Sequence, residues 1–503
     1  MMRIAAIDVG SNAMRMVIGE VDGSGRVNVV ENIRLPVRLG QDVFSKGYLE
    51  EKTIQQTEEA FLHFRHVADG FNVARLRAVA TSAAREAANK DLLVDRIFRT
   101  TGIEIEIISG EDEARLIHSA VTHVLDLKEK RTLLIDIGGG SIEVTISSGQ
   151  NIISTDSYNL GTVRLLEILN TENQSGQLFG KMVREFVEAA RYRIERDIGN
   201  EKIQVCVGTG GNVEEIGHLR QKLFKGDSDR FVTVEELARL IERLNDLSYE
   251  ERISKLKLRP DRADVILPAS IVLHLIAHEA GVKQIMIPNV GLKDGILHEI
   301  ADELSKSPGP QKREQVWESA LHMGRKYQFD EGHACLTARL AARLFEQTKS
   351  LHNLNGNNLL LLEIGSLLHD IGHFINTIDH DKHGYYLLNA NRLIGLSLRE
   401  QNIVANLVRY HRRASPSMED EDFRSLPQKD RLVIFKLSVL LCLADSLDIS
   451  HTGKVTDVIL KETKTGWRMK LSGEKDLMLV NWALGKRKSH FREVFGVNLE
   501  MES

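Results

Sequence analysis

Two stretches of the sequence combine an acidic residue with a glycine turn after an apolar run. In one of them, the apolar run Leu133–Ile135 is followed by Asp136 and then by a turn that contains Gly138–Gly140 and Ser141. An alternating apolar pattern comes after this turn. A turn of three glycines lets backbone N–H groups approach an anion without interference from Cβ atoms, and an aspartate can hold a hydrated cation. The spacing favours a phosphate cradle at the tip of a β-hairpin, although an ordinary glycine-rich turn has the same pattern.

The other stretch lies near the N-terminus and repeats this order of apolar run, acidic residue and polar turn. Its members are Ile4–Ile7, Asp8, Gly10, Ser11 and Asn12. The repeat indicates two similar domains that face each other across one phosphate site. A third turn, Gly208–Gly211, follows a predicted strand and precedes a predicted helix, whose N-terminus would form a natural anion site.

Two further groups of residues could act on a phosphate. Arg85 stands at a strand-to-helix junction after Thr81 and Ser82, and its guanidinium could pair with phosphate oxygens or be a solvated helix arginine. Glu111–Glu113 form an acidic cluster at the start of a helix, where acidic residues often do no more than complement the helix dipole. A carboxylate is also chemically suited to orient and deprotonate a water that attacks phosphorus.

These motifs resemble those of the actin, sugar kinase and heat-shock ATPase superfamily, and within it those of the exopolyphosphatase / guanosine pentaphosphate phosphohydrolase (Ppx/GppA) family. The matching segments occur in the family's order between residues 6 and 297: AIDVGSN at 6–12, ATSAAREA at 80–87, ISGEDEARLI at 108–117, LIDIGGGSIE at 134–143, NLGTVRL at 159–165, VGTGGNVEEIG at 207–217, RADVILPA at 262–269 and GLKDGIL at 291–297.

The resemblance implies an α/β protein with a duplicated actin-like (ribonuclease H-like) fold, and it gives roles to particular residues. Glu113 takes the role of the general base. Mg²⁺ near Asp8, Asp136 and Glu143 would neutralise phosphate charge, and Arg85 would add to this effect; Glu143 could instead be an exposed strand residue. The glycine turns would hold the terminal phosphates by backbone N–H groups. The phosphate-binding residues would be Gly10, Ser11, Asn12, Gly138, Gly139, Gly140, Ser141, Gly208, Gly210 and Gly211.

A different set of chemical groups lies in the C-terminal part of the chain, which is helical by pattern after a linker at Ser305–Lys312. Its candidate metal ligands, in chain order, are His333, His369, Asp370 and Asp445, with His383 and His411 as additional candidates. Mixed imidazole and carboxylate ligands suit Mn²⁺, Fe²⁺ or Mg²⁺ better than a closed structural zinc site. The set resembles the HD phosphohydrolase superfamily and implies a second metal site; the alternative is that these histidines are only packed or solvated.

The length of 503 residues predicts about three or four domains. We expect an actin-like domain I at 1–125, an actin-like domain II at 126–304, a helical HD-type domain at 313–450 and a small β-rich domain at 451–503. The last of these contains three segments with strand-like alternation: Val455–Leu460, Trp467–Leu471 and Leu477–Val480.

Composition restricts the class of protein. No apolar run reaches the length that spans a membrane, and the strand pattern from Arg3 leaves no room for a signal peptide, so a cytoplasmic location is expected. The three cysteines are far apart and indicate neither a disulfide framework nor a thiolate zinc site. The formal net charge of −5 does not suggest nucleic-acid binding, and any polyanion must be attracted by a local concentration of the 66 lysines and arginines.

The resemblance implies an exopolyphosphatase that cuts the terminal phosphoanhydride of inorganic polyphosphate and releases orthophosphate. Guanosine pentaphosphate is the alternative substrate, because both molecules present a terminal anhydride to the same cradle. An ATP-dependent kinase and a non-catalytic polyphosphate or nucleotide sensor remain as other readings, and a homodimer through the C-terminal domains is expected.

Overall fold

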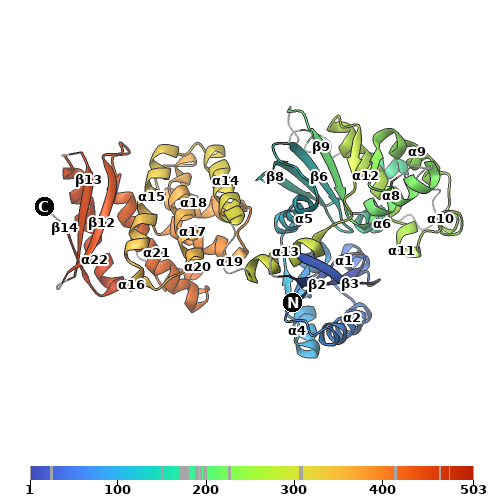
Figure 1. Cartoon of the computed structure of the whole chain (residues 1–503), viewed down its shortest axis with the longest axis horizontal. Helices are drawn as coiled ribbons and strands as arrows, with labels where there is room; N and C mark the ends of the chain where they lie inside the picture. The colour runs from blue at the N-terminus through green and yellow to red at the C-terminus, as the bar shows by residue number, and fades with distance from the viewer. Residues whose placement is uncertain are drawn as a thin grey trace. The chain divides into compact units, whose positions relative to one another are not determined.

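The structure is a computed structural model of the chain. It describes residues 2–22, 26–149, 151–169, 201–224, 228–304, 310–412, 416–463, 466–474 and 476–501, together with part of 178–195. The chain forms two compact units, Met1–Ser307 and Pro308–Ser503, and each is described by itself (Figure 1). The division falls inside the predicted linker, whose last residues, Pro310–Lys312, already belong to helix α14 and whose residues 305–309 lie outside the described part.

The first sheet of the N-terminal unit has the order β3-β2-β1-β4-β5. Its strands are β1 (Met2–Val9), β2 (Met14–Val21), β3 (Val27–Leu35), β4 (Arg75–Ala80) and β5 (Ile105–Ile107). β1 to β3 pair antiparallel, and β4 and β5 continue the sheet in parallel with β1. The accompanying helices are α1 (Leu39–Lys46), α2 (Glu51–Gly70), α3 (Ser82–Glu86), α4 (Lys90–Thr101) and α5 (Gly110–Val124).

The second sheet repeats this topology and adds an antiparallel strand, β10, at one edge. Its order is β10-β11-β9-β6-β7-β8, with β6 (Arg131–Ile137), β7 (Ile142–Ser148), β8 (Asn151–Tyr158), β9 (Val205–Thr209), β10 (Phe231–Thr233) and β11 (Gln284–Met286). β6 to β8 pair antiparallel and β9 is parallel to β6, as β4 is to β1. Both hairpins with polar turns are therefore confirmed, and the chain contains the two actin-like α/β sheets that the repeat indicated.

The helices of the second half follow in the order α6 (Thr162–Leu169), α8 (Gly211–Phe224), α9 (Val234–Asn245), α10 (Tyr249–Leu256), α11 (Pro260–Ala263), α12 (Ile266–Glu279) and α13 (Leu292–Leu304). α12 is apolar almost all round and is buried in the core of the second half. α13 instead packs against β1, β2 and α5, although it comes last in the unit (Figure 1). Its residues Ile296 and Leu297 share one core with Ile4 of the first sheet and Leu134 of the second.

The C-terminal unit begins with a helical region around the buried, apolar α17 (Gly356–Leu368). The other helices of this region are α14 (Pro310–Lys326), α15 (Glu331–Gln347), α16 (Lys349–His352), the 3₁₀ helix η1 (Ile371–Phe374), α18 (His380–Ala390), α19 (Leu398–Arg409), α20 (Glu421–Arg424) and α21 (Gln428–Leu447). In the described residues, no helix has the length and apolar character needed to cross a membrane.

A small three-stranded sheet, β12-β13-β14, closes the C-terminal unit. β12 (Val455–Thr463) and β13 (Gly466–Gly473) confirm two of the predicted strands. The third, Leu477–Val480, is wrong because Met478–Phe495 form helix α22, and the third strand is β14 (Asn498–Met501). Val480, Leu484 and Phe491 follow helical spacing and are buried, a pattern that a four-residue window cannot reveal.

Candidate active site

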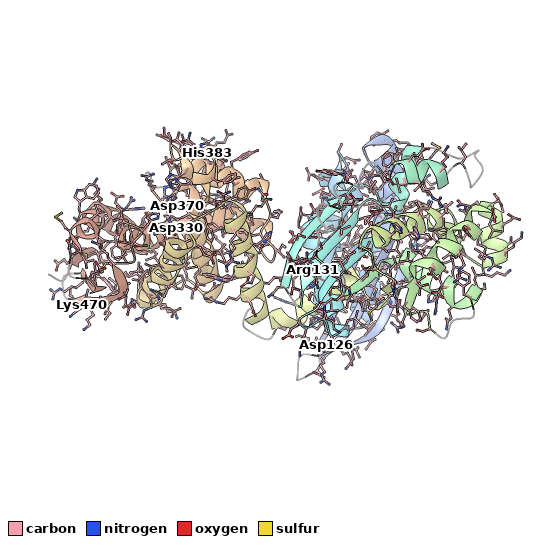
Figure 2. All side chains as sticks on the ribbon, turned by 90° about the horizontal axis from the view of Figure 1, so that it is seen from above. Asp126, Arg131, Asp330, Asp370, His383 and Lys470 are labelled. Atoms are coloured by element: carbon pink, nitrogen blue, oxygen red, sulfur yellow. The ribbon has the colours of Figure 1, made fainter. Side chains whose placement is uncertain are left out.

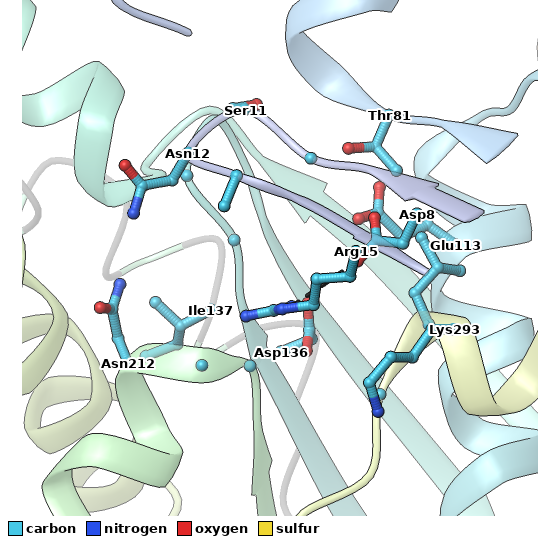
Figure 3. Close-up of a pocket in the computed structure, with 18 of the residues that line it drawn as sticks. Asp8, Ser11, Asn12, Arg15, Thr81, Glu113, Asp136, Ile137, Asn212 and Lys293 are labelled. Atoms are coloured by element: carbon cyan, nitrogen blue, oxygen red, sulfur yellow. Dashed lines mark ion pairs between the residues drawn. The ribbon is translucent and has the colours of Figure 1, made fainter. Parts of the chain in front are cut away.

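The ends of the two central strands bring the acidic residues of both repeats into one cleft of the N-terminal unit. Asp8 lies near the end of β1 and Asp136 near the end of β6, and both line the same pocket (Figure 3). Arg15 on β2 reaches across this pocket, and its Nη1 lies 3.6 Å from Oδ2 of Asp8. The turn Gly10–Asn12 and the turn at Gly138 and Gly139 form the adjoining wall.

Three carboxylates, those of Glu113, Asp136 and Glu143, lie close together at this cleft. Asp136 and Glu143 are directly opposite in the β6–β7 ladder, and Glu113 projects toward them from the first turn of α5. One oxygen of each residue lies within 4.8 Å of the other two. Glu143 is only 1% exposed and Glu113 only 6%, so Glu143 is not the exposed strand residue that was the alternative. Among the residues that the structure describes, the Oε2 atoms of both glutamates are buried without a hydrogen-bond partner.

Unpartnered buried carboxylate oxygens are costly, and at this position they are suited to bind a cation or a polar substrate. Oxygen donors at this spacing fit a hard ion such as Mg²⁺. Asp136 also accepts a hydrogen bond of 2.5 Å from Oγ1 of Thr209, which orients one of its oxygens. Ser157 donates to Oε1 of Glu143 at 2.9 Å, so Oε2 of that residue is the atom left for a ligand.

The close packing of these acids changes their protonation. Burial, with the nearby Asp136 charge, raises the pKa of Glu143 to about 7, and burial raises the pKa of Asp136 to about 6. Burial and the charges of Glu143 and Asp136 also raise the pKa of Glu113. Burial raises the pKa of Asp8, which Arg15 partly offsets. These carboxylates therefore retain protons at pH values where an exposed carboxylate has lost them.

This electrostatic conflict predicts that Glu143→Gln stabilises the metal-free protein. The native fold binds this proton more tightly than the unfolded chain, so stability falls as pH rises from 4.5 to about 7. Removing the charge should add about 3 kcal/mol to the free energy of unfolding at pH 8 and little at pH 5. Calorimetry in EDTA at both pH values measures the difference, with the exposed Glu242→Gln as control. An equal gain at both pH values would attribute the effect to packing instead.

The glycine turns divide into residues that line the cleft and residues that pack. The predicted phosphate ligands on the pocket wall are Gly10, Ser11, Asn12, Gly138, Gly139, Gly210 and Gly211. Gly140, Ser141 and Gly208 are absent from that wall. A Cβ atom on Gly140 would lie 2.3 Å from the ring of Phe44, and one on Gly208 would lie 2.8 Å from Val213. These two glycines therefore allow close packing of neighbouring elements rather than close approach of an anion.

Arg85 lies on α3 beside the acidic group. Its Nη1 donates to the carbonyl of Ile108 at 2.6 Å, which holds the guanidinium next to the start of α5. From this position its charge lowers the pKa values of Glu113 and Glu143 against the stronger effect of burial. Arg85 is not among the residues that line the pocket. Its influence on the cleft is therefore its effect on the pKa values of these two glutamates.

Sequence reasoning missed the basic residues of the cleft. Arg262 is 5% exposed and lines the pocket together with Arg15 and Lys293. A Cβ atom on Gly211 would lie 2.1 Å from Nη2 of Arg262 and 2.4 Å from Nη2 of Arg15, so both guanidinium groups converge on the first residue of α8. Arg262 and Lys293 stand in the matching segments RADVILPA and GLKDGIL, but nothing in their own spacing showed that they face the turns.

The positions of Arg15, Arg262 and Lys293 favour binding of an anionic ligand in the pocket. Nη1 of Arg262 donates to Oδ1 of Asn212 at 2.7 Å, while its Nε is buried and has no hydrogen-bond partner among the described residues. Burial and the charge of Arg15 lower the pKa of Arg262 to about 9, because both disfavour the charged guanidinium. Figure 3 shows Arg15 between Asp136 and the wall that carries Asn12 and Asn212. The N-terminus of α8 adds its partial positive charge at the same place.

The C-terminal unit brings the predicted metal ligands together as a histidine cluster. Nε2 of His333 lies 3.2 Å from Nε2 of His369, and Oδ1 of Asp445 lies 3.6 Å from both. Oδ2 of Asp370 lies 3.6 Å from Nε2 of His369. Burial alone would lower the pKa of His333, but hydrogen bonds with Asp445 and Asp448 raise it to about 9. Despite burial, the histidines hold the pKa values of Asp370 and Asp445 well below their usual range.

Among the additional candidates, His411 joins this cluster and His383 does not take the expected place. Nε2 of His411 lies 3.1 Å from Nε2 of His380, the first residue of α18, and the ring of His411 also contacts that of His369. His383 is nearly one turn farther along and is labelled apart from Asp370 and Asp330 in Figure 2. His373 and His451 also approach Asp370 and were not foreseen. The sequence DHDKH gave no basis for choosing between its two histidines.

Comparison with known families agrees with this architecture. The model of the Ppx/GppA phosphatase family matches residues 16–304, which is more than half of the chain. The chain belongs to the Ppx/GppA phosphatase family. The model of Ppx/GppA phosphatase domain III matches residues 317–487 and so covers most of the C-terminal unit.

Individual relatives in the Ppx/GppA family resemble different extents of the chain. A guanosine-5'-triphosphate,3'-diphosphate pyrophosphatase from Photobacterium profundum is 28% identical over 456 residues, which are 87% of this chain and 86% of that protein. One from Aliivibrio fischeri is 26% identical over 89% of this chain and 88% of the relative. The crystal structure of the Aquifex aeolicus member of the family is 25% identical, with a TM-score of 0.53, and covers 61% of this chain and 99% of its own.

An exopolyphosphatase structure from Cytophaga hutchinsonii shares the fold. It has a TM-score of 0.56 at 24% identity, over 60% of this chain and 98% of that chain. The two solved structures therefore match about the length of the N-terminal unit, whereas the pyrophosphatases also extend over domain III.

Proposed function

We propose that the cleft of the N-terminal unit hydrolyses a terminal phosphoanhydride and releases orthophosphate, with Glu113 as the general base. The observation that carries this proposal is the buried, unpartnered Oε2 of Glu113 beside Asp136 and Glu143, in a pocket walled by polar turns and two converging guanidinium groups. A carboxylate with a raised pKa is a stronger base once it is ionised, and Glu113 lines the same pocket as the polar turns, where it could orient a water for attack on phosphorus.

The other residues of the cleft have complementary roles in this proposal. Backbone N–H groups of Gly10–Asn12, Gly138 and Gly139 would hold the terminal phosphate, and Gly210 and Gly211 would add donors from the start of α8. Arg15, Arg262 and Lys293 would bind the adjoining phosphates of the leaving group, because all three line the pocket. Mg²⁺ held by Asp136 and Glu143, with Asp8 nearby, would neutralise phosphate charge when bound.

We place guanosine pentaphosphate first among the substrates, which reverses the order expected from the sequence. The relatives that align over both units are named as pyrophosphatases of guanosine 5'-triphosphate 3'-diphosphate, and they share about the whole length of this chain. Polyphosphate presents the same terminal anhydride and remains the second candidate. The cleft geometry concerns only the phosphates, so the preference between the two rests on these relatives.

A substrate comparison tests the preference. Orthophosphate release is measured with Mg²⁺ at equal concentrations of terminal phosphate groups. The kcat/KM should be at least about tenfold higher for guanosine pentaphosphate than for long-chain polyphosphate, which corresponds to a difference of about 1.4 kcal/mol in activation free energy. The reverse ratio would restore exopolyphosphatase as the assignment. Tight binding of either compound without turnover would favour a sensor, and transfer of phosphate from ATP to an acceptor would favour a kinase.

For domain III, we propose that His333, His369, Asp370 and Asp445 bind one divalent transition-metal ion such as Mn²⁺ or Fe²⁺. The support is that Nε2 of His333, Nε2 of His369 and Oδ1 of Asp445 lie within 3.2–3.6 Å of one another, and that Oδ2 of Asp370 lies 3.6 Å from Nε2 of His369. Three or four donors of imidazole and carboxylate type suit such ions. The Asp370→Ala variant should lose metal that the wild type retains through gel filtration, and unchanged metal content would rule the assignment out.

A further inference from the structure

Arg38 contacts both halves of the N-terminal unit beside the pocket. It precedes the first residue of α1 and is not among the described residues that line the pocket. Its Nε donates to Oδ1 of Asn12 at 2.8 Å, and its Nη1 donates to Oδ2 of Asp264 at 2.7 Å. Its Nη2 lies 3.3 Å from the carbonyl oxygen of Asp261 and 3.3 Å from Oδ1 of Asp264. One side chain thus binds a polar turn of the first half and the region of α11 in the second half.

We infer that Arg38 is a positioning residue for the cleft, which aligns the turn Gly10–Asn12 with Arg262 on α11. The turn would hold the terminal phosphate, and Arg262 would bind the adjoining phosphates. The inference therefore rests on the proposed function, and it adds the residue that fixes these two groups relative to each other. Arg38 itself would touch neither phosphate.

The amide of Asn12 is fixed by a partner at each end. Its Oδ1 accepts from Arg38, and its Nδ2 donates to the carbonyl of Asp261 at 3.2 Å. A guanidinium only donates and a carbonyl only accepts, so these partners determine which end of the amide is the oxygen. The neighbouring backbone adds a contact, because the N–H of Gly40 donates to the carbonyl of Ser11 at 2.8 Å. The segment that begins with Arg38 therefore holds this turn through both a side chain and the backbone.

The same contacts fix the short helix that carries Arg262. The carbonyl of Asp261 belongs to the peptide bond that precedes Arg262. It accepts one hydrogen bond from Asn12 and another from Arg38. Asp264 follows the last residue of α11, so the guanidinium of Arg38 contacts this region at two points. A helix of four residues has few internal hydrogen bonds, and its orientation therefore depends on such contacts.

Hydrogen bonds also connect Arg262 to the other two glycine turns. Its Nη1 donates to Oδ1 of Asn212, and Nδ2 of Asn212 donates to Oγ1 of Thr162 at 3.2 Å. The N–H of Thr162 in turn donates to the carbonyl of Gly138 at 3.1 Å. The three turns are therefore linked through α11, and Arg38 lies where the first turn joins this network.

Arg34 makes a second ion pair between the same two halves and provides a comparison. It lies on β3, and its Nη2 pairs with Oδ2 of Asp261. The exposed fractions of the two arginine side chains are similar, 18% for Arg34 and 20% for Arg38. In the part of the chain that the structure describes, the side chain of Arg34 bonds to this carboxylate and not to the turn Gly10–Asn12. The two arginines therefore distinguish ion pairing between the halves from positioning of the turn.

Steady-state kinetics of the full-length chain test the inference, with Mg²⁺ and the better of the two proposed substrates. Arg38→Gln should raise KM about tenfold and lower kcat about threefold, because small displacements of substrate-positioning groups have large effects on rate. Arg34→Gln, the matched control, should change either constant by less than about threefold. Equal losses in both variants would assign the effect to ion pairing between the halves and overturn the inference.

A double variant separates positioning from general damage to the fold. Arg38→Gln should raise KM by less than about threefold in an Arg262→Ala background, because the side chain that it positions is then missing. If Arg38→Gln raises KM by the same factor in both backgrounds, Arg38 acts independently of Arg262 and the inference is wrong.

A milder variant, Asp264→Asn, keeps the shape of the acceptor and serves if Arg38→Gln does not fold. It should raise KM in the same direction by a smaller factor, and thermal unfolding checks that the fold is retained. A wild type that releases orthophosphate from neither substrate would overturn the proposed function and this inference with it. An active wild type whose KM is unchanged in Arg38→Gln, or in Asp264→Asn where only that variant folds, would overturn this inference alone.

Discussion

Replacement of Glu113 by glutamine is expected to lower the rate of orthophosphate release by on the order of 10²–10⁴. Glutamine has the same shape but cannot accept the proton of the attacking water. The loss should appear in kcat rather than in KM, because the phosphate ligands in the turns remain. Initial rates with Mg²⁺ and guanosine pentaphosphate, over a range of substrate concentrations, measure both constants.

The same variant should not lose stability. Glu113 is buried beside Glu143 and Asp136 with a raised pKa, so a neutral side chain relieves repulsion at neutral pH. Glu111→Gln, two residues earlier on the same helix, is the matched control and should leave the rate within about twofold of wild type, since surface changes have small effects. If release survives in Glu113→Gln but disappears in Asp370→Ala, the chemistry belongs to domain III and the assignment of the base is wrong.

Arg262→Ala is expected to raise the KM for guanosine pentaphosphate by about 10- to 100-fold. A hydrogen bond to a charged group contributes about 1.5–3 kcal/mol, and in the described part of the chain the buried Nε of Arg262 has no hydrogen-bond partner. Because this guanidinium lies at the first turn of α8 rather than beside Glu113, the effect on kcat should be smaller. Steady-state kinetics and direct binding to a Glu113→Gln protein measure the two contributions separately.

The control for this prediction is Arg259→Ala. Arg259 lies three residues earlier and is exposed, with only a loose ion pair to Asp261 at 3.9 Å. Its removal lowers the net charge of the chain by the same amount but should change KM by less than about threefold. If both variants weaken binding equally, a general electrostatic field, and not a contact from Arg262, attracts the substrate.

The fold was predictable because its signals are local and repeated. Strand periodicity around Asp8 and Asp136, with a polar turn after each, defined two hairpins that the structure contains. Helix α2 covers the range whose apolar residues follow helical spacing, including Ile54, Phe61 and Phe64. By contrast, the strand predicted at Leu477–Val480 is wrong, because this segment forms the start of helix α22. A short apolar segment does not distinguish a strand from a buried helical turn.

The site was only partly predictable, for a different reason. The hydrophobic pattern of the sequence is enough to locate acidic residues near the ends of strands, such as Asp8 and Asp136. Arg15 and Arg262 meet only because two segments far apart in the chain converge at Gly211. In the same way, the choice of His380 over His383 depends on where α18 begins and on its contact with Gly372. Motifs identify such residues, whereas their spatial roles require the tertiary structure.

The position of α13 has a consequence for dissecting the molecule. This helix follows the second sheet in sequence but packs on β1, β2 and α5, so the first half of the N-terminal unit is completed by residues near its end. A fragment that stops at residue 125 would expose Ile4, Ala6 and Leu116, which α13 and its neighbours bury. Such a fragment should aggregate when expressed alone, and ribosomal synthesis must reach Leu304 before the N-terminal half can complete its core.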